Sequence, residues 1–171
     1  LERADFLGRL MLDYDMPISI SGTHGKTTTT SMLTSVMLCA ESDPTVLVGG
    51  ELNLIGGNYR IGSRKYLVFE GCEYVDSFLK FNPYAAISLN IEADHLDYFS
   101  GIEQIKQSFN KFMKKVPKKG FVVINSDDPN VIEASKGVEC EIITYGKNGE
   151  FSYKNLEFDE NGHGIFDVMH N

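Results

Sequence analysis

The sequence predicts an α/β fold, with a mostly parallel sheet that carries helices on both faces. Short apolar runs alternate along the chain with amphipathic helical patterns, and a glycine-rich turn joins the first run to the helix after it. Strands and helices that alternate in this way are typical of parallel sheets linked by right-handed crossovers. With 171 residues, 42% of them hydrophobic, the chain is long enough to bury a core as one domain.

The first predicted elements are a short helix, a strand and a longer helix. Apolar residues recur at helical spacing from Phe6 to Met11, and Pro17 introduces the β-branched run 18–20. A second helix is expected from Lys26 onward, although its four successive threonines have low helix propensity. Its predicted apolar face consists of Met32, Leu33, Val36, Met37 and Ala40.

Five further apolar runs predict strands that are covered on both faces. These runs are 45–48, 66–69, 85–89, 120–125 and 140–145. A capping box at 100–103 opens a helix with an apolar stripe from Ile102 to Val116, and Asp128 before Pro129 opens another that Gly137 closes. Predicted strands and helices therefore alternate along the chain, as expected for a sheet with helices on both faces.

Two glycine- or turn-rich regions predict hairpins. The stretch 48–62 carries five glycines and predicts a mobile loop or a tight hairpin. Apolar residues alternate from Phe151 to Phe158, and the turn residues 160–162 follow them. The chain is therefore expected to end in a small β-hairpin.

The turn Gly22-Thr23-His24-Gly25-Lys26-Thr27 lies between a predicted strand and a predicted helix, as a phosphate-binding loop requires. Its glycines allow backbone amides to point inward, and the helix N-terminus favours an anion. Lys26 would then reach the β and γ phosphates, and the Thr27 hydroxyl would bind Mg²⁺. Ile20 stands where the longer form of the motif has glycine, so a plain strand-to-helix turn stays an alternative.

Polar residues follow two later strands at the edge where open α/β sheets bind ligands. Glu70 directly follows an apolar strand and could hold the Mg²⁺ through a hard oxygen ligand. The segment from Asn90 to Asp97 follows the next strand and is unusually polar for a turn. His95 in that segment is, from the residues alone, more typical of a hydrogen-bonded loop histidine than of a magnesium ligand.

Composition excludes several functional classes. The formal net charge of −8 disfavours a nucleic-acid surface, and no apolar stretch is long enough to span a membrane. Three widely spaced cysteines, without a CxxC pair or a signal segment, favour free thiols in the cytoplasm. A GTPase would carry an NKxD motif, but Asn110-Lys111 is followed by Phe112-Met113 and lies in a predicted helix.

Three motifs resemble those of the Mur ligases. They are GTHGKTTTT at 22–30, LVFEGCEYVDSFL at 67–79 and NIEADHLD at 90–97, in the family's order and at compatible spacing. The resemblance implies that residues 1–171 form only the central ATP-binding domain of a P-loop NTPase-like ligase. The amino-terminal domain that holds the uridine nucleotide and the carboxyl-terminal domain would lie outside this sequence.

The resemblance also implies an activity, in which ATP and Mg²⁺ drive amide formation between UDP-N-acetylmuramate and L-alanine through an acyl phosphate. Lys26, Glu70 and His95 are then expected to act in catalysis, and Thr27, Glu70 and His95 to hold metal. The residues expected to bind the nucleotide are Gly22, Thr23, His24, Gly25, Lys26, Thr27, Thr28 and Asn90.

One departure and two alternatives remain. Cys72 stands where the family often has an acidic residue, so Cys72, Glu73 and Asp76 receive no role from the resemblance. A sibling ligase that attaches a recycled tripeptide shares a similar phosphate loop. A nucleotide-binding module without activity of its own is the other alternative for these 171 residues.

Overall fold

The computed structural model describes residues 2–171, which build one nine-stranded mixed sheet. Its strands are β1 (Met16–Ser21), β2 (Thr45–Leu52), β3 (Gly57–Arg60), β4 (Tyr66–Glu70), β5 (Ala85–Ser88), β6 (Phe121–Asn125), β7 (Glu141–Tyr145), β8 (Phe151–Phe158) and β9 (Gly164–His170). The order across the sheet is β3-β2-β4-β1-β5-β6-β7-β8-β9. All neighbouring pairs are parallel except β2 with β3 and β8 with β9, which confirms the predicted mostly parallel sheet.

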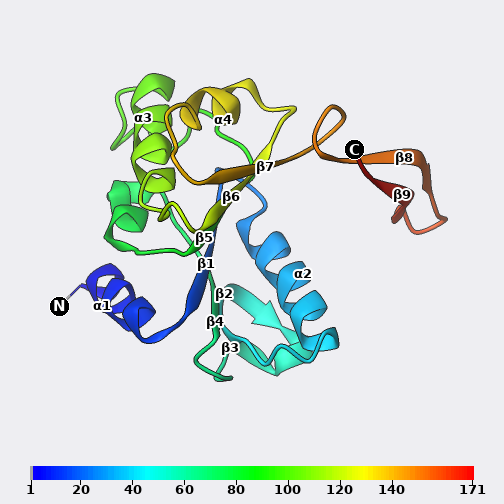
Figure 1. Ribbon diagram of the computed structural model, residues 1–171, viewed down its shortest axis with the longest axis horizontal. Helices are drawn as coiled ribbons and strands as arrows, with labels where there is room; N and C mark the ends of the chain where they lie inside the picture. Colours follow the sequence, from blue (N-terminus) through cyan, green and yellow to red (C-terminus); the bar gives the residue numbers. More distant parts are fainter. Residues whose placement is uncertain (1) are drawn as a thin grey trace.

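Helices cover both faces of the sheet, as predicted (Figure 1). They are α1 (Arg3–Leu10), α2 (Lys26–Cys39), α3 (Ile102–Met113) and α4 (Pro129–Ala134), with 3-10 turns η1 (Met11–Asp13), η2 (Asn53–Ile55) and η3 (Tyr74–Lys80). Side chains alternate along β4, so Leu67 and Phe69 join the core beneath α1 and α3, whereas Val68 joins the core beneath α2. Each face of the central strands is therefore buried against its own helical layer.

The helix predicted from Lys26 is present as α2, but its predicted apolar face is only partly confirmed: Leu33 and Met37 pack on the sheet, whereas Met32, Val36 and Ala40 are exposed. Met32 is 65% exposed, whereas Thr30 and Thr34 are fully buried. Both threonine hydroxyls donate to the carbonyl oxygen four residues earlier, at 2.8 and 2.7 Å. Because the helix itself accepts these hydroxyl protons, threonine can pack against the sheet without an unsatisfied polar group.

The apolar stripe of α3 is buried as predicted, but the capping box that was expected to open the helix is wrong. The N-cap is Gly101, which has no side chain that could accept a hydrogen bond. The amide of Ser100 donates to Oε1 of Gln104 at 2.7 Å, one residue beyond the glutamate of the expected motif. Glu103 binds Lys106 at 2.6 Å instead. The side chain that accepts the Ser100 amide at the start of α3 is therefore that of Gln104 and not that of Glu103.

The start of α4 follows the prediction, but the burial of β7 does not. The Asp128 carboxylate caps α4 by accepting the amides of Asn130 and Val131 at 2.8 and 3.1 Å. Ile142 in β7 is 36% exposed, although the run 140–145 was expected to be covered on both faces. The reason is that α2 packs on β1, β2 and β4, at the other end of the sheet.

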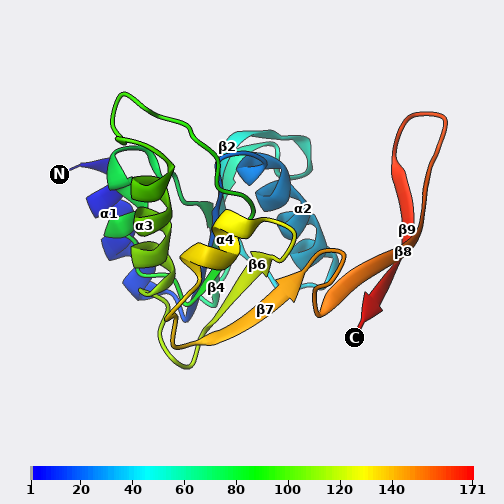
Figure 2. The ribbon, with the colours of Figure 1, turned by 90° about the horizontal axis from the view of Figure 1, so that it is seen from above.

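Both predicted hairpins are present. The glycine-rich stretch folds back as the antiparallel pair β2 and β3, and β8 pairs with β9 at the end of the chain. Figure 2 shows that the β8–β9 hairpin projects away from the layered body of the domain. Within residues 2–171 no helix is both long and apolar enough to cross a membrane.

Candidate active site at the carboxyl edge of the central strands

The strand order decides which segments meet at the edge of the sheet. β1 lies between β4 and β5, and all three strands run parallel. The loop that follows β1 is therefore flanked by Glu70 at the end of β4 and by the segment after β5. Ligands of open α/β sheets bind at such a point, where successive strands leave in opposite directions across the sheet.

The predicted phosphate loop opens α2 with free backbone donors. Gly25 is the N-cap with φ of 84°, a left-handed conformation that glycine adopts without strain. The first helical bond runs from the Thr29 amide to the Gly25 carbonyl at 2.9 Å. The amides from Gly25 to Thr28 precede that bond and therefore lack intrahelical partners, so this first turn can receive anionic oxygens.

Asn90 fixes the loop from the neighbouring strand. Its Oδ1 accepts the His24 amide at 2.8 Å, its Nδ2 donates to the His24 carbonyl at 3.1 Å, and its carbonyl accepts the Thr23 amide at 3.1 Å. A Cβ on Gly22 would lie 2.9 Å from the Leu89 Cβ, so only glycine allows this approach. Asn90 therefore fixes the loop backbone, and the amides of Thr23 and His24 donate to Asn90 in this structure.

Thr27 and Glu70 meet across the edge. The Thr27 hydroxyl donates to Oε2 of Glu70 at 3.0 Å, and the amide of Gly49 donates to Oε1 at 2.6 Å. These two side chains come from α2 and β4, which are 43 residues apart in the sequence. The loop and the strand-end carboxylate thus lie together, as the sequence predicted for the edge.

Lys26 is folded back onto its own loop and onto an acidic residue that sequence reasoning left without a role. Its Nζ donates to the carbonyls of Gly22 and Thr23 at 2.5 and 3.2 Å, and to both carboxylate oxygens of Glu73 at 3.1 and 3.3 Å. The Glu73 side chain is only 2% exposed. The signal in the sequence was a second glutamate three residues after Glu70, in the same loop.

His95 reaches the site through Glu73. Its Nε2 lies 3.9 Å from Oε1 of Glu73 and 3.9 Å from Oδ2 of Asp94, and its ring lies 4.6 Å from the ring of Tyr74. The structure therefore places His95 next to Lys26's partner, whereas the contacts of Thr27 run to Glu70. His24 extends outward instead, with Nε2 3.7 Å from Glu92.

The loop after β4 is held in an uncommon conformation. Val75 and Asp76 have φ of 49° and 57°, which is a costly left-handed geometry for a β-branched residue. The Tyr98 hydroxyl donates to Asp76 at 2.9 Å, and the Tyr74 hydroxyl donates to Asp97 at 2.9 Å. The latter hydrogen bond and the charge of Asp97 raise the pKa of Tyr74. These bonds tie the loops after β4 and β5 to each other.

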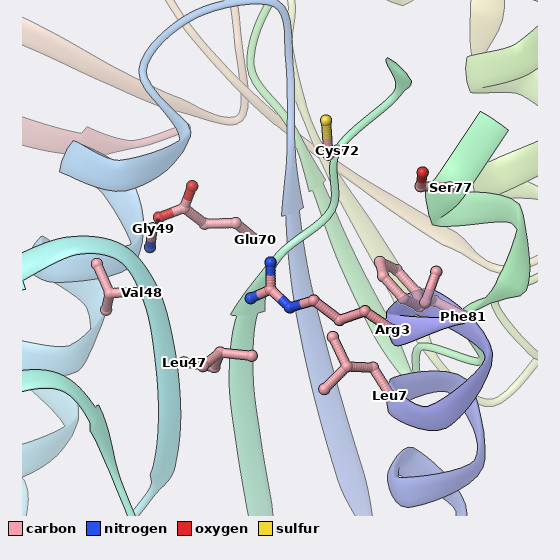
Figure 3. Close-up of a pocket in the computed structure, with 10 residues that line it drawn as sticks. Arg3, Leu7, Leu47, Val48, Gly49, Glu70, Cys72, Ser77 and Phe81 are labelled. Carbon is pink, nitrogen blue, oxygen red and sulfur yellow. Dashed lines mark hydrogen bonds between the residues drawn. The ribbon is translucent and has the colours of Figure 1, made fainter. Parts of the chain in front are cut away.

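A pocket of about 320 Å³ borders Glu70 between α1 and the ends of β2 and β4. Figure 3 shows Arg3 extending from α1 toward Glu70, with Leu7 below its side chain and Phe81 beside it. Cys72 and Ser77 also line the pocket. The pocket thus combines apolar side chains with a cationic and an anionic side chain.

The donor set at this edge fits a magnesium ion held partly by phosphate. In residues 2–171 no group of three or more His, Cys, Asp or Glu side chains is arranged to hold a metal. Thr27 and Glu70 supply two hard oxygen donors, and Mg²⁺ in phosphate sites takes few protein ligands and completes its shell with water and phosphate oxygens.

The comparisons with known proteins decide the family. A model described as the Mur ligase middle domain matches residues 20–171. The chain belongs to the Mur ligase middle-domain family. A curated Mur ligase relative, UDP-N-acetylmuramate–L-alanine ligase from Acetivibrio thermocellus, is 55% identical over 172 residues, with 99% of this chain and 37% of the relative covered. The chain thus spans little more than a third of the length of this relative.

Solved structures of Mur ligases share the fold. A UDP-N-acetylmuramate:L-alanyl-gamma-D-glutamyl-meso-diaminopimelate ligase from Neisseria meningitides superposes with a TM-score of 0.84 at 27% identity, covering 98% of this chain and 56% of that one. A UDP-N-acetylmuramate-alanine ligase from Thermotoga maritima gives 0.75 at 26% identity, covering 90% of this chain and 34% of that one. The α/β architecture is therefore that of the Mur ligase middle domain.

Proposed function

We propose that this chain is the central ATP-binding domain of a cytoplasmic ligase that joins L-alanine to the carboxylate of UDP-N-acetylmuramate, in peptidoglycan precursor synthesis. The observation that carries the proposal is the 3.0 Å contact between Thr27 and Glu70, beside the amides at the start of α2 that have no intrahelical partner. Free thiols at Cys39, Cys72 and Cys140 support a reducing compartment.

The loop would bind the triphosphate of ATP. The amides from Gly25 to Thr28 would donate to phosphate oxygens, and the positive end of the α2 dipole would favour their charge. Lys26 would place its ammonium against the β and γ phosphates, where negative charge is redistributed during phosphoryl transfer. Thr23, His24 and Asn90 would keep the loop backbone in the shape that this binding needs.

Thr27 and Glu70 are proposed to hold Mg²⁺, because their oxygens already meet and suit a hard cation. The ion would neutralise phosphoryl oxygens and so reduce the repulsion between two anions that must react. His95 is proposed to serve a second metal site. Its Nε2 lies 3.9 Å from Oε1 of Glu73, and the Glu73 carboxylate would orient the His95 ring.

The acceptor carboxylate is proposed to enter the pocket that borders Glu70. Arg3 would pair with that carboxylate, and Leu7 and Phe81 would exclude water from the apolar side. The substrate oxygen attacks the γ phosphorus and ADP leaves, which gives an acyl phosphate. The amine then attacks the acyl carbon and phosphate leaves, so the protein supplies position and charge but no nucleophile.

Sequence identity supports L-alanine over a tripeptide as the amine substrate. The chain is 55% identical to the alanine ligase from Acetivibrio thermocellus and 27% identical to the tripeptide ligase from Neisseria meningitides. The test is phosphate release by the complete enzyme with ATP, Mg²⁺ and UDP-N-acetylmuramate. We expect release with L-alanine and none with the tripeptide, and the reverse pattern would replace this proposal with the sibling activity.

The 171 residues alone are proposed to be inactive in ligation, because binding groups of the other two domains would be missing. Product formed by this domain without them would contradict that proposal. Asn110 lies in α3, and its side chain donates to the carbonyls of Ala134 and Lys136 at 2.7 and 2.9 Å, so it is not placed to recognise a guanine base. Competition between ATP and GTP for the complete enzyme tests this point: a preference for GTP would contradict the ligase proposal.

A further inference from the structure

Glu73 is a buried carboxylate whose ion pair with Lys26 has no part in the proposed chemistry. Its side chain is 2% exposed, and its two oxygens lie 3.1 and 3.3 Å from Nζ of Lys26. A carboxylate without solvent is stable as an anion only when a cation or several donors compensate it. Lys26 provides that compensation, so the ion pair stabilises the loop after β4 against the phosphate loop.

The same ion pair occupies the side chain that the nucleotide needs. An ammonium group has three protons, and Nζ of Lys26 already bonds to the Gly22 carbonyl, the Thr23 carbonyl and Glu73. A phosphate oxygen that binds Nζ must therefore replace one of these acceptors. Glu73 is the acceptor whose negative charge a polyphosphate would repel.

Glu73 is held where it is by the loop that carries it. Tyr74 bonds to Asp97 and packs on His95, and Asp76 accepts the hydroxyls of Tyr98 and Ser108. These contacts fix the residues on the carboxyl side of Glu73 to the segment after β5 and to α3. The carboxylate therefore cannot follow Lys26, and His95, with Nε2 3.9 Å away, is the next donor that could approach it.

We propose that Glu73 is a positioning residue that holds Lys26 in the nucleotide-free protein and competes with the phosphates for its ammonium group. The inference rests on the proposed nucleotide site. Glu73 lowers the affinity for nucleotide, since the loop presents its lysine already neutralised. Loss of the Glu73 charge thus strengthens nucleotide binding, whereas damage to the fold would weaken it.

The test measures binding of a non-hydrolysable ATP analogue, AMP-PNP with Mg²⁺, to the complete enzyme by calorimetry at fixed ionic strength. Glu73→Gln keeps the shape of the side chain and removes its charge. We expect its dissociation constant to fall roughly three- to tenfold, the size of one partly screened charge interaction. Glu73→Asp keeps the charge but shortens the side chain by one methylene. We expect its dissociation constant to lie between those of the wild type and Glu73→Gln.

Two controls separate this effect from a general change in charge. Glu51→Gln removes an exposed carboxylate of β2 and should leave the dissociation constant within about twofold of the wild type, because solvent and salt screen that charge. In a Lys26→Ala background, Glu73→Gln should give less tightening than in the wild type, since the competition requires both side chains.

Each outcome decides the inference. Unchanged or weaker binding by Glu73→Gln would overturn it, and so would equal tightening by Glu73→Gln with and without Lys26. If Glu73→Gln does not fold, unchanged or weaker binding by Glu73→Asp overturns it in the same way. Failure of the wild type to bind AMP-PNP at all would instead overturn the proposed function.

Discussion

The phosphate-loop edge and the β8–β9 hairpin differ in whether their polar groups bond to neighbouring segments of the fold. At the phosphate-loop edge, Thr23, Lys26, Thr27 and Asn90 all bond to a neighbouring segment. The β8–β9 hairpin instead bonds mainly to itself and exposes apolar side chains, with Phe158 at 68% and Val168 at 67%. Both regions are loops or hairpins attached to the same sheet.

The difference shows where this fold concentrates chemistry. Three parallel strands deliver a loop, a carboxylate and an amide to one place, so each side chain there limits the positions of the others. In the described residues the hairpin is in ladder register with β7 at a single pair, Tyr145 with Phe151. Changes at the loop edge should therefore alter activity, and changes in the hairpin should alter only local order.

The largest effect is expected at Lys26. Lys26→Ala in the complete enzyme should lower the rate of phosphate release by about three orders of magnitude or more, because the transferring phosphoryl group loses its cation. It should also lower the free energy of unfolding, since the buried Glu73 loses the ammonium group that compensates its charge. Adding Glu73→Gln should restore stability but not activity, and wild-type turnover by Lys26→Ala would contradict the assignment.

Glu70→Gln should change the dependence on magnesium. The variant keeps a side chain of the same shape next to Thr27 but removes the charge that would attract the cation. We expect the Mg²⁺ concentration for half-maximal rate to rise at least about tenfold, with partial recovery at high Mg²⁺. A magnesium titration of phosphate release measures this, and an unshifted titration would remove Glu70 from the metal site.

Asn90→Ala should have a moderate effect on both stability and binding. It removes two side-chain hydrogen bonds to His24, which costs about 1–2 kcal/mol in the free energy of unfolding. Nucleotide affinity should fall with it, because the loop loses the contact that shapes it. Urea unfolding and AMP-PNP calorimetry measure the two effects, and weaker binding without any loss of stability would indicate that Asn90 contacts the nucleotide directly.

The smallest effect is expected in the hairpin turn. Asp159 accepts the amides of His163 and Asn161 at 2.7 and 2.9 Å, and these bonds and the His163 ring hold the pKa of its carboxyl below the ordinary 3.8. A lowered folded pKa stabilises the turn above pH 3.8, and that stabilisation is lost as pH falls through the lower value. The protection factor of the Asn161 amide, which is corrected for the pH dependence of intrinsic exchange, should therefore fall at acid pH, and Asp159→Asn should remove that dependence.

Local patterns predicted most of the fold, because apolar runs and cap residues act on their own neighbours. The strands, the α3 stripe and the Asp128 cap depend on sequence periods that a single strand or helix can express. The burial of Thr30 and Thr34 escaped the pattern, since it depends on hydroxyl bonds within α2 rather than on hydrophobicity. Strand length and spacing likewise gave no sign that β7 lies beyond the reach of α2.

The site was predictable to a similar extent. Gly25, Lys26 and Thr27 belong to a compact motif, and Glu70 follows a strand whose end must reach the same edge. Glu73 was not predictable, because a glutamate is buried only when a cation compensates it, and its cation lies 47 residues away in the chain. The clamp that Asn90 forms on His24 required knowing which strand lies next to β1.

A crystal structure of the protein with AMP-PNP and Mg²⁺ tests the central claim most directly. The account predicts phosphate oxygens within hydrogen-bonding distance of the amides from Gly25 to Thr28, and a metal ion that contacts both Thr27 and Glu70. A nucleotide bound away from this loop, or a phosphate-bound metal that contacts neither Thr27 nor Glu70, would contradict it.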